Sequence, residues 1–178
     1  MNYKKIVIAF GLILGLNSCV GLNPNGGYDI TVPLSMVNTT VQGNFPQTKK
    51  VSYGTLLIEK PNILSNSGGD KLGVGTGFKF TNMLIPNGIK GTVSLSSGIR
   101  FDAQTKGLYL ASPMVDELKI QKFSLSKYLT PSLRNQIGQI IAQTLAKQPI
   151  YSLQGKTGVS FVKGISVNEG AIIVNVGL

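Results

Sequence analysis

Residues 71–80 read KLGVGTGFKF, and their strict alternation decides what kind of fold the chain can form. Every second side chain from Leu72 to Phe80 is apolar or a threonine, whereas the positions between them carry glycine or lysine. Because successive side chains of a strand point to opposite faces, the pattern predicts a strand with one buried and one exposed face. The chain is therefore expected to build a sheet that covers a core on one side.

The motif GVGTG at residues 73–77 invites comparison with the glycine-rich loops that bind nucleotides. The dinucleotide fingerprint, however, is G-x-G-x-x-G at a turn that leads into a helix. Here the glycines alternate within strand sequence and share one face. We interpret them as the bare outer face of a sharply bent strand, which permits coiling or close approach of another backbone.

The same period of two continues on both sides of this segment, from residue 49 to about 124. It predicts further strands at 51–57, 93–101 and 108–120, with shorter ones at 148–153 and within 164–178. Short connectors that contain glycine, asparagine or aspartate predict antiparallel hairpins, and they lie at Asn66–Asp70, Asn87–Gly88 and Ala103–Gly107.

Two segments follow the helical period instead. Thr130–Lys147 has a threonine that can cap the helix, a proline at the first helical position and one strongly apolar face. Thr31–Gln42 is predicted to be a shorter N-terminal helix with Pro33 in its first turn. The fold class predicted from these elements is α+β, with a highly curved antiparallel β-sheet wrapped around one long amphipathic helix.

The N-terminal segment has the layout of a secretory signal peptide. Lys4 and Lys5 precede an apolar run from Ile6 to Leu16, which is shorter than the roughly 20 residues of a membrane-spanning helix. The run ends in LNSC, and Cys19 is the only cysteine in the chain. This stretch resembles the lipobox of bacterial lipoproteins, which implies that Cys19 carries a lipid such as palmitate.

This N-terminus predicts the organisation of the whole chain. Residues 1–18 are expected to be a lipoprotein signal peptide, and 19–27 a flexible tether, because VGLNPNGG is rich in turn residues. Residues 28–178 are expected to form a single domain. The location predicted is the periplasmic side of the cell envelope. Because no aspartate follows Cys19, the inner leaflet of the outer membrane is favoured over the inner membrane.

The formal net charge of +10 is compatible with a nucleic-acid, anionic-membrane or unspecific basic surface. The lysines, however, are spread singly or in pairs without any block of five. A secreted location removes most nucleic-acid partners as well. We therefore expect no nucleic-acid partner, and a membrane contact through acylated Cys19.

No combination of residues predicts catalysis. The chain contains no histidine, which removes the usual base of a serine or cysteine nucleophile and a common metal ligand. Asp116 and Glu117 are adjacent acids, but neighbours on a strand point to opposite faces, so a solvated charge cluster is the better interpretation. The protein is predicted not to be an enzyme and to need no cofactor or metal.

Apolar side chains on the inner faces of these elements allow two interpretations. They could fill a core, or they could line an elongated apolar pocket if the sheet does not close. The residues assigned to such a ligand-binding lining are Tyr53, Phe78, Phe80, Phe101, Tyr109, Ile137 and Ile141, with Phe123 a further inward-facing aromatic.

Five pieces of sequence, in this order, resemble the YceB-type bacterial periplasmic lipoproteins, a domain of unknown function. They are Cys19 with its signal, YDIT at 28–31, KGLYL at 106–110, the long helix ending in QPIYSL at 148–153, and GISV at 164–167 with GAIIV at 170–174. This family is in turn similar to the tubular lipid-binding superfamily. The resemblance implies a highly curved sheet around a helix, an apolar channel and no catalytic residues.

The function predicted is therefore that of a membrane-tethered periplasmic lipoprotein that binds or carries lipid or another long apolar ligand without catalysis. The alternative is a structural or assembly lipoprotein of the envelope, with a fully packed core and no ligand. An exposed apolar patch without a deep cavity would favour this alternative.

Overall fold

The computed structural model describes residues 20–22, 26–51, 53–65, 70–121 and 129–177. The predicted signal peptide, Cys19 and Phe123 lie outside the described residues. Every buried residue of the core lies between Ile30 and Val176, so a chain that begins at residue 20 keeps all described packing contacts. No helix in this described part is long and apolar enough to cross a bilayer.

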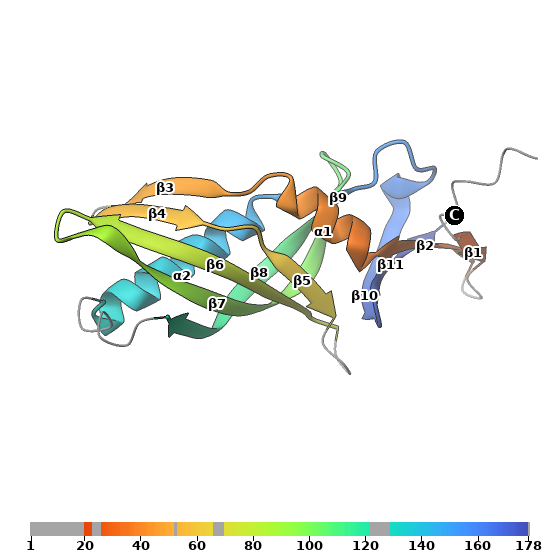
Figure 1. Cartoon of the computed structure of the whole chain (residues 1–178). Helices are drawn as coiled ribbons and strands as arrows, with labels where there is room; N and C mark the ends of the chain where they lie inside the picture. The colour runs from red at the N-terminus through yellow and green to blue at the C-terminus, as the bar shows by residue number, and fades with distance from the viewer. Residues whose placement is uncertain (1–19, 23–25, 52, 66–69, 122–128, 178) are drawn as a thin grey trace, which may run out of the picture.

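The predicted α+β class is wrong, because the protein is mostly β (Figure 1). Strands make up 59% and helices 20% of the described residues. The predicted long amphipathic helix is absent. The segment instead forms α2 (Pro131–Ala146), a helix of 16 residues. It is about 24 Å long, which is much shorter than the longest strands. Its apolar face is narrow, because exposed glutamines occupy the opposite side and Gly138 takes one of the buried positions, so burial of the strands provides most of the core.

A curled, half-barrel sheet of seven antiparallel strands forms the larger part of the molecule (Figure 1). Its order is β3 (Gln47–Val51), β4 (Gly54–Ile58), β6 (Leu72–Asn82), β7 (Ile85–Asp102), β8 (Gly107–Ile120) and β9 (Pro149–Ser152), and β5 (Asn62–Ser65) pairs with β6. The predicted inner face of β6 is confirmed, since its side chains from Leu72 to Phe80 are at most 5% exposed. GVGTG lies inside this strand, and β7 rather than a helix follows.

A second sheet of four strands lies at one end of the molecule (Figure 1). Its order is β1 (Val20–Leu22), β2 (Gly27–Pro33), β11 (Ala171–Gly177) and β10 (Val162–Asn168), and a short 3-10 turn, η2 (Val159–Phe161), precedes β10. Part of the segment predicted to be a tether is thus a strand, because Val20–Leu22 pair with Tyr28–Ile30.

The predicted helix at Thr31–Gln42 begins too early. The helix α1 spans Leu34–Gln42, and Thr31 lies in β2 opposite Ile173. Ile30 and Val32 are almost fully buried, so the alternation of the β-branched residues of β2 outweighs the helix-start signal.

Two predicted features of the larger sheet are also wrong. The strand predicted at 51–57 is a hairpin that turns between Val51 and Gly54, the last pair of the β3–β4 ladder. The connector predicted at Asn87–Gly88 lies inside β7, and the chain turns instead at Met83–Leu84. There the side chain of Asn82 accepts a hydrogen bond from the backbone N–H of Ile85 (2.8 Å), which closes the turn without glycine.

The helix α2 packs on the inner side of the sheet against β8. Its start is as predicted, since Pro131 takes the first position and the hydroxyl of Thr130 accepts from the N–H of Leu133 (3.3 Å). A Cβ atom at Gly138 would lie 3.0 Å from Val115, so the backbone of the helix approaches β8 closely. The helix is thus held toward β8.

The β7–β8 turn depends on the charge of Asp102. Its carboxylate accepts hydrogen bonds from the N–H (2.9 Å) and hydroxyl (3.0 Å) of Thr105 and from the N–H of Gln104 (3.1 Å). These hydrogen bonds lower the pKa of Asp102, and the two from Thr105 contribute most. The guanidinium of Arg100, 3.7 Å from the carboxylate, lowers this pKa further.

We expect NMR titration to give Asp102 a pKa below that of an aspartate in a model peptide. Because the folded-state pKa is lowered, the stabilisation is present above the unfolded-state pKa and is lost as pH falls through the folded-state pKa. Asp102→Asn should remove this part of the acid dependence of the melting temperature. A pKa equal to the peptide value would show that these hydrogen bonds do not act on the carboxylate.

Candidate functional site

The sheet is open along β3, and this edge faces α2. Within the described residues no strand pairs with the second edge of β3. A groove of about 690 Å³ runs between the two elements, and its lining is Lys49, Lys50, Val51, Tyr53, Gln136, Gln139, Ile140, Gln143, Thr144, Lys147 and Gln148. A second hollow of about 310 Å³ is lined by Tyr53, Asn82, Thr130, Ser132, Leu133 and Gln136. Because they share Tyr53 and Gln136, we treat them as one site, the seam.

The two faces of α2 explain why the seam stays open. Ile137, Ile141 and Leu145 are buried and belong to the core. Gln136 and Gln143 lie on the opposite side at helical spacing, and both are exposed along the seam. A glutamine side chain keeps its amide in water, so this side of the helix does not close against β3.

The apolar part of the seam is small, and both hollows contribute to it. Val51 and Ile140 are half-buried and line the larger hollow, and Leu133 is half-buried and lines the smaller one. Tyr53 lines both and is 64% exposed. These four side chains give the seam an apolar strip beside its amide groups.

The seam is basic and contains no acidic side chain. Its lining includes Lys49, Lys50 and Lys147 but neither aspartate nor glutamate. The ion pairs Arg100–Asp102 and Glu117–Lys119 do not involve these three lysines, and no carboxylate lies in the described lining to neutralise them. The chain has no acidic residue anywhere from 118 to 168, which includes the whole of α2. The seam therefore has a positive potential that favours anions.

The structure does not bring the seven predicted lining residues together. Phe78, Phe80, Ile137 and Ile141 are at most 1% exposed and pack in the core, outside both hollows of the seam. Phe101 and Tyr109 lie where β7 and β8 meet their connecting turn and line neither hollow, although Tyr109 pairs with Pro149, which follows Gln148 of the seam.

Tyr109 has local partners of its own. The guanidinium carbon of Arg100 lies 4.6 Å from its ring centre, and its hydroxyl donates to Thr105 (3.1 Å). Of the predicted lining, Tyr53 alone lies in the seam.

Sequence reasoning missed most of the residues that do form the seam. In the sequence, the lysines at 49, 50 and 147 do not stand out from an evenly basic surface. A signal was available in the acid-free stretch at 118–168 and in the regular glutamines 136, 139 and 143 around Ile140.

The residues considered for catalysis have separate surface partners. Asp116 accepts a hydrogen bond from Ser96 (2.9 Å), and Glu117 pairs with Lys119 (2.8 Å). Both acids are exposed, in agreement with a solvated charge cluster. In the described part of the chain, no group of three histidine, cysteine, aspartate or glutamate side chains could hold a metal ion.

Comparison with known proteins matches residues 64–170 to a family model described as "Protein of unknown function (DUF1439)". The match runs from within β5 to the residue before β11, more than half of the chain. No curated protein matches the sequence. Among solved structures, a similar one is the crystal structure of P47 of Clostridium botulinum E1, with a TM-score of 0.46 and 10% identity. The alignment covers 98% of this chain and 54% of that one, so this chain spans about half of its length.

Proposed function

We propose a ligand for this chain, which belongs to the DUF1439 family of proteins of unknown function. The chain binds an anionic amphiphile, such as a fatty acid or phospholipid, in the seam. The observation that carries this proposal is the lining, which combines an apolar strip with three lysines and no acid. The curled sheet is compatible with a lipid-binding fold. The volume of the larger hollow is within the range of about 300–1,000 Å³ that is common for small-molecule sites.

The order of residues along the seam suggests how the ligand lies. Because β3 and α2 run in opposite directions, Lys49 and Lys147 meet at one end, and Tyr53 and Leu133 meet toward the other. An acyl chain along the apolar strip would gain about 25 cal/mol for each Å² removed from water. An anionic headgroup would then lie near the lysines, where the glutamine amides supply further donors.

The cellular setting is part of the same proposal. We take Cys19 to be acylated after removal of residues 1–18, which tethers the protein to a membrane on the periplasmic side, with the outer membrane favoured. Two acyl chains suffice for stable attachment, whereas one chain holds only marginally. The resemblance to YceB-type lipoproteins and to the tubular lipid-binding superfamily supports both the location and the class of ligand.

The test is to purify residues 20–178 without detergent and to combine native mass spectrometry with titration of a fluorescent fatty acid. We expect co-purified lipid or saturable uptake of the probe at one site per chain. Lys49→Gln with Lys147→Gln should weaken uptake about ten-fold, because the headgroup loses two cationic partners. The matched control is Lys60→Gln with Lys163→Gln, which removes two exposed lysines outside the seam.

An apo mass together with no uptake of fatty acid or phospholipid would contradict the proposal. It would favour the structural or assembly lipoprotein with a packed core. Equal losses in the seam and control variants would show that uptake depends on net charge alone and not on the seam.

A further inference from the structure

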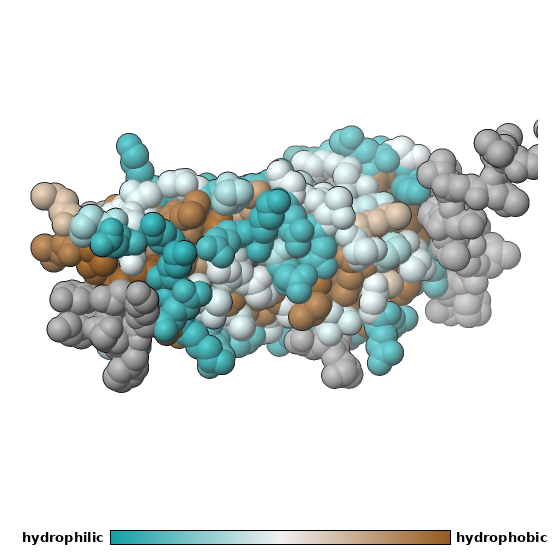
Figure 2. All heavy atoms as spheres, viewed as in Figure 1, coloured by the Kyte–Doolittle hydropathy of each residue, from teal (hydrophilic) through white to brown (hydrophobic). Residues whose placement is uncertain are grey.

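The turn between β6 and β7 exposes two adjacent apolar side chains at one end of the molecule. Met83 is 99% and Leu84 is 84% exposed, the two highest values among the exposed large apolar side chains. Figure 2 shows hydrophobic residues gathered at this end, where the hairpin of Figure 1 projects beyond its neighbours. Turns of this kind normally carry glycine, asparagine, aspartate or proline. We call Met83 and Leu84 the tip.

The tip is held in this exposed arrangement by the hairpin beneath it. The hydrogen bond from Ile85 to Asn82 closes the turn, and Ile85 itself is 8% exposed. Since Ile85 anchors the turn from the inside, Met83 and Leu84 have no core to enter. Two large apolar side chains that a closed turn keeps in water indicate a contact with something outside the chain.

Two lysines lie behind the tip, and the nearest acid, Glu59, lies over Gly77, on the far side of Lys79 from the tip. Lys79 and Lys90 are directly opposite each other in the β6–β7 ladder, an unfavourable arrangement of like charges that no carboxylate relieves among the described ion pairs. The stem of Lys79 packs over Gly88, where a Cβ atom would lie 2.6 Å from the Lys79 Cε atom. The sequence from 71 to 101 contains no acidic residue.

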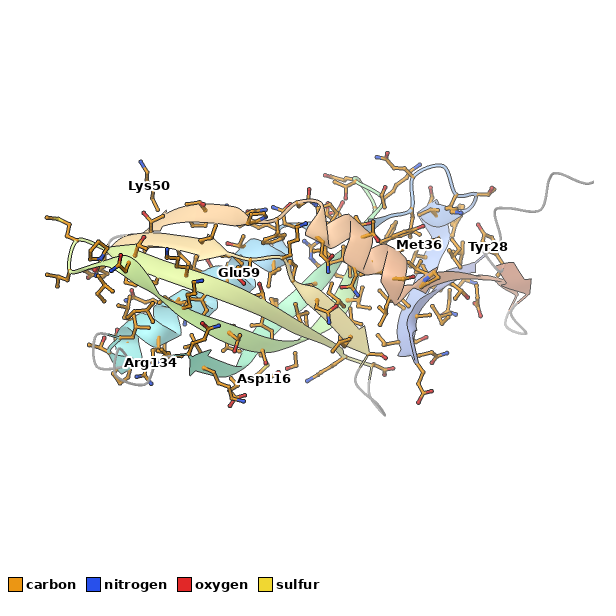
Figure 3. The ribbon with its side chains drawn as sticks, viewed as in Figure 1. Tyr28, Met36, Lys50, Glu59, Asp116 and Arg134 are labelled. Carbon is orange, nitrogen blue, oxygen red and sulfur yellow. The ribbon has the colours of Figure 1, made fainter. Side chains whose placement is uncertain are left out.

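The charge distribution separates this end from the rest of the molecule. Figure 3 places Lys50 and Arg134 toward the tip and shows Glu59 and Asp116 nearer the middle. The hairpins and the helix that surround the tip contain no acid in residues 47–58, 78–91 and 129–148. An apolar projection surrounded by cations is complementary to an anionic lipid surface, since acyl chains accept the tip and headgroups pair with the lysines.

We propose that the tip docks on an anionic lipid bilayer, with Met83 and Leu84 in the acyl region and Lys79 and Lys90 among the headgroups. The exposure and the charge of the hairpin support this docking, whether or not the seam holds a ligand. Asn82, next to Met83, also lines the smaller hollow of the seam. If the proposed function holds, the seam therefore opens at the docked end. Because β1 lies at the opposite end of the molecule, docking adds a second lipid contact to the proposed anchor (Figure 1).

The experiment is vesicle flotation of residues 20–178, which lack the apolar N-terminal run, with phosphatidylcholine alone or mixed with phosphatidylglycerol. We expect binding to the anionic vesicles that weakens with salt. Met83→Ser with Leu84→Ser should lower partitioning by about ten-fold or more, because two fully inserted side chains are lost. Lys79→Gln with Lys90→Gln should lower it on anionic vesicles and remove much of the salt dependence.

Matched controls keep the test specific. Met36→Ser changes an exposed methionine near the opposite end, and Lys60→Gln with Lys163→Gln removes two lysines elsewhere, so neither should change flotation. All these side chains are at least partly exposed, so the variants should melt like the parent. The seam variant at Lys49 and Lys147 should still float even if it no longer takes up fatty acid, which separates this proposal from the proposed function.

Lipid docking would be overturned if the parent did not bind anionic vesicles, or if the tip variant floated with them as well as the parent does. A third outcome also overturns it. If the parent forms dimers in the absence of lipid and the tip variant does not, the tip is a contact with a second copy of the chain.

Discussion

Replacing Ile141 with aspartate is expected to abolish cooperative folding, whereas the same change at the adjacent Ile140 should leave the chain folded. Ile141 is 0% exposed in the core, where a carboxylate would be buried without a partner. The expected cost of more than about 5 kcal/mol equals much of the stability of an ordinary domain. Ile140 is half-buried in the seam, where water and nearby lysines accept a carboxylate.

Both isoleucines belong to the apolar face that the sequence predicts for the Thr130–Lys147 helix, so the sequence alone does not separate them. Circular dichroism melts of residues 20–178 would separate them, since the Ile141 variant should show no transition and the Ile140 variant a transition near that of the parent. The Ile140 variant should also lose fatty-acid uptake, because its carboxylate interrupts the apolar strip and repels the headgroup. Two variants that melt alike would mean that the helix is oriented differently about its axis.

Gly91→Ala is expected to have the next largest effect and to destabilise the protein by about 2–3 kcal/mol. Gly91 is directly opposite Phe78 in the β6–β7 ladder, and the ring of Phe78 covers it. A Cβ atom there would lie 2.6 Å from the ring and would also overlap the backbone carbonyl of Lys119. The carbonyl belongs to the neighbouring strand and cannot move without disturbing the ladder, and Phe78 is fully buried.

Gly75→Ala is the matched control, because a Cβ atom at this position meets nothing within 4 Å. Removing a glycine from a strand interior should raise stability by about 0.5–1 kcal/mol. Urea titrations of the two variants would measure both changes. If Gly91→Ala were as stable as Gly75→Ala, the close contact between β6, β7 and β8 at this point would be refuted.

Local patterns in the sequence were enough to predict several parts of the fold. The alternation of residues 71–80 predicted the inner face of β6, and Thr130 with Pro131 predicted the start of α2. These signals are reliable because they depend on neighbours along the chain: the period of a strand and the free N–H groups of a first helical turn.

The errors have a common physical origin. Thr31 has a residue type that caps helices, yet it forms part of β2 because β11, from the other end of the chain, pairs with it. Asn87–Gly88 has the composition of a turn, yet it continues β7 because Asn82 closes the hairpin earlier. At Thr31, pairing with a strand distant in sequence outweighs the local preference for a helix cap. At Asn87–Gly88, a side-chain hydrogen bond earlier in the chain outweighs the local preference for a turn.

The sequence by itself determined which faces of the strands are apolar, where the helices lack acids, and that the chain carries a single cysteine behind an apolar run. The tertiary structure alone decided that β3 is an open edge and that α2 leans toward β8 rather than toward β3. The close approach of Gly138 to Val115 draws the helix to one side, and the exposed glutamines keep the other side wet. The seam therefore arises from strand order and register, which are set by contacts between residues far apart in the chain, whereas the tip lies where the Asn82–Ile85 hydrogen bond closes the β6–β7 hairpin.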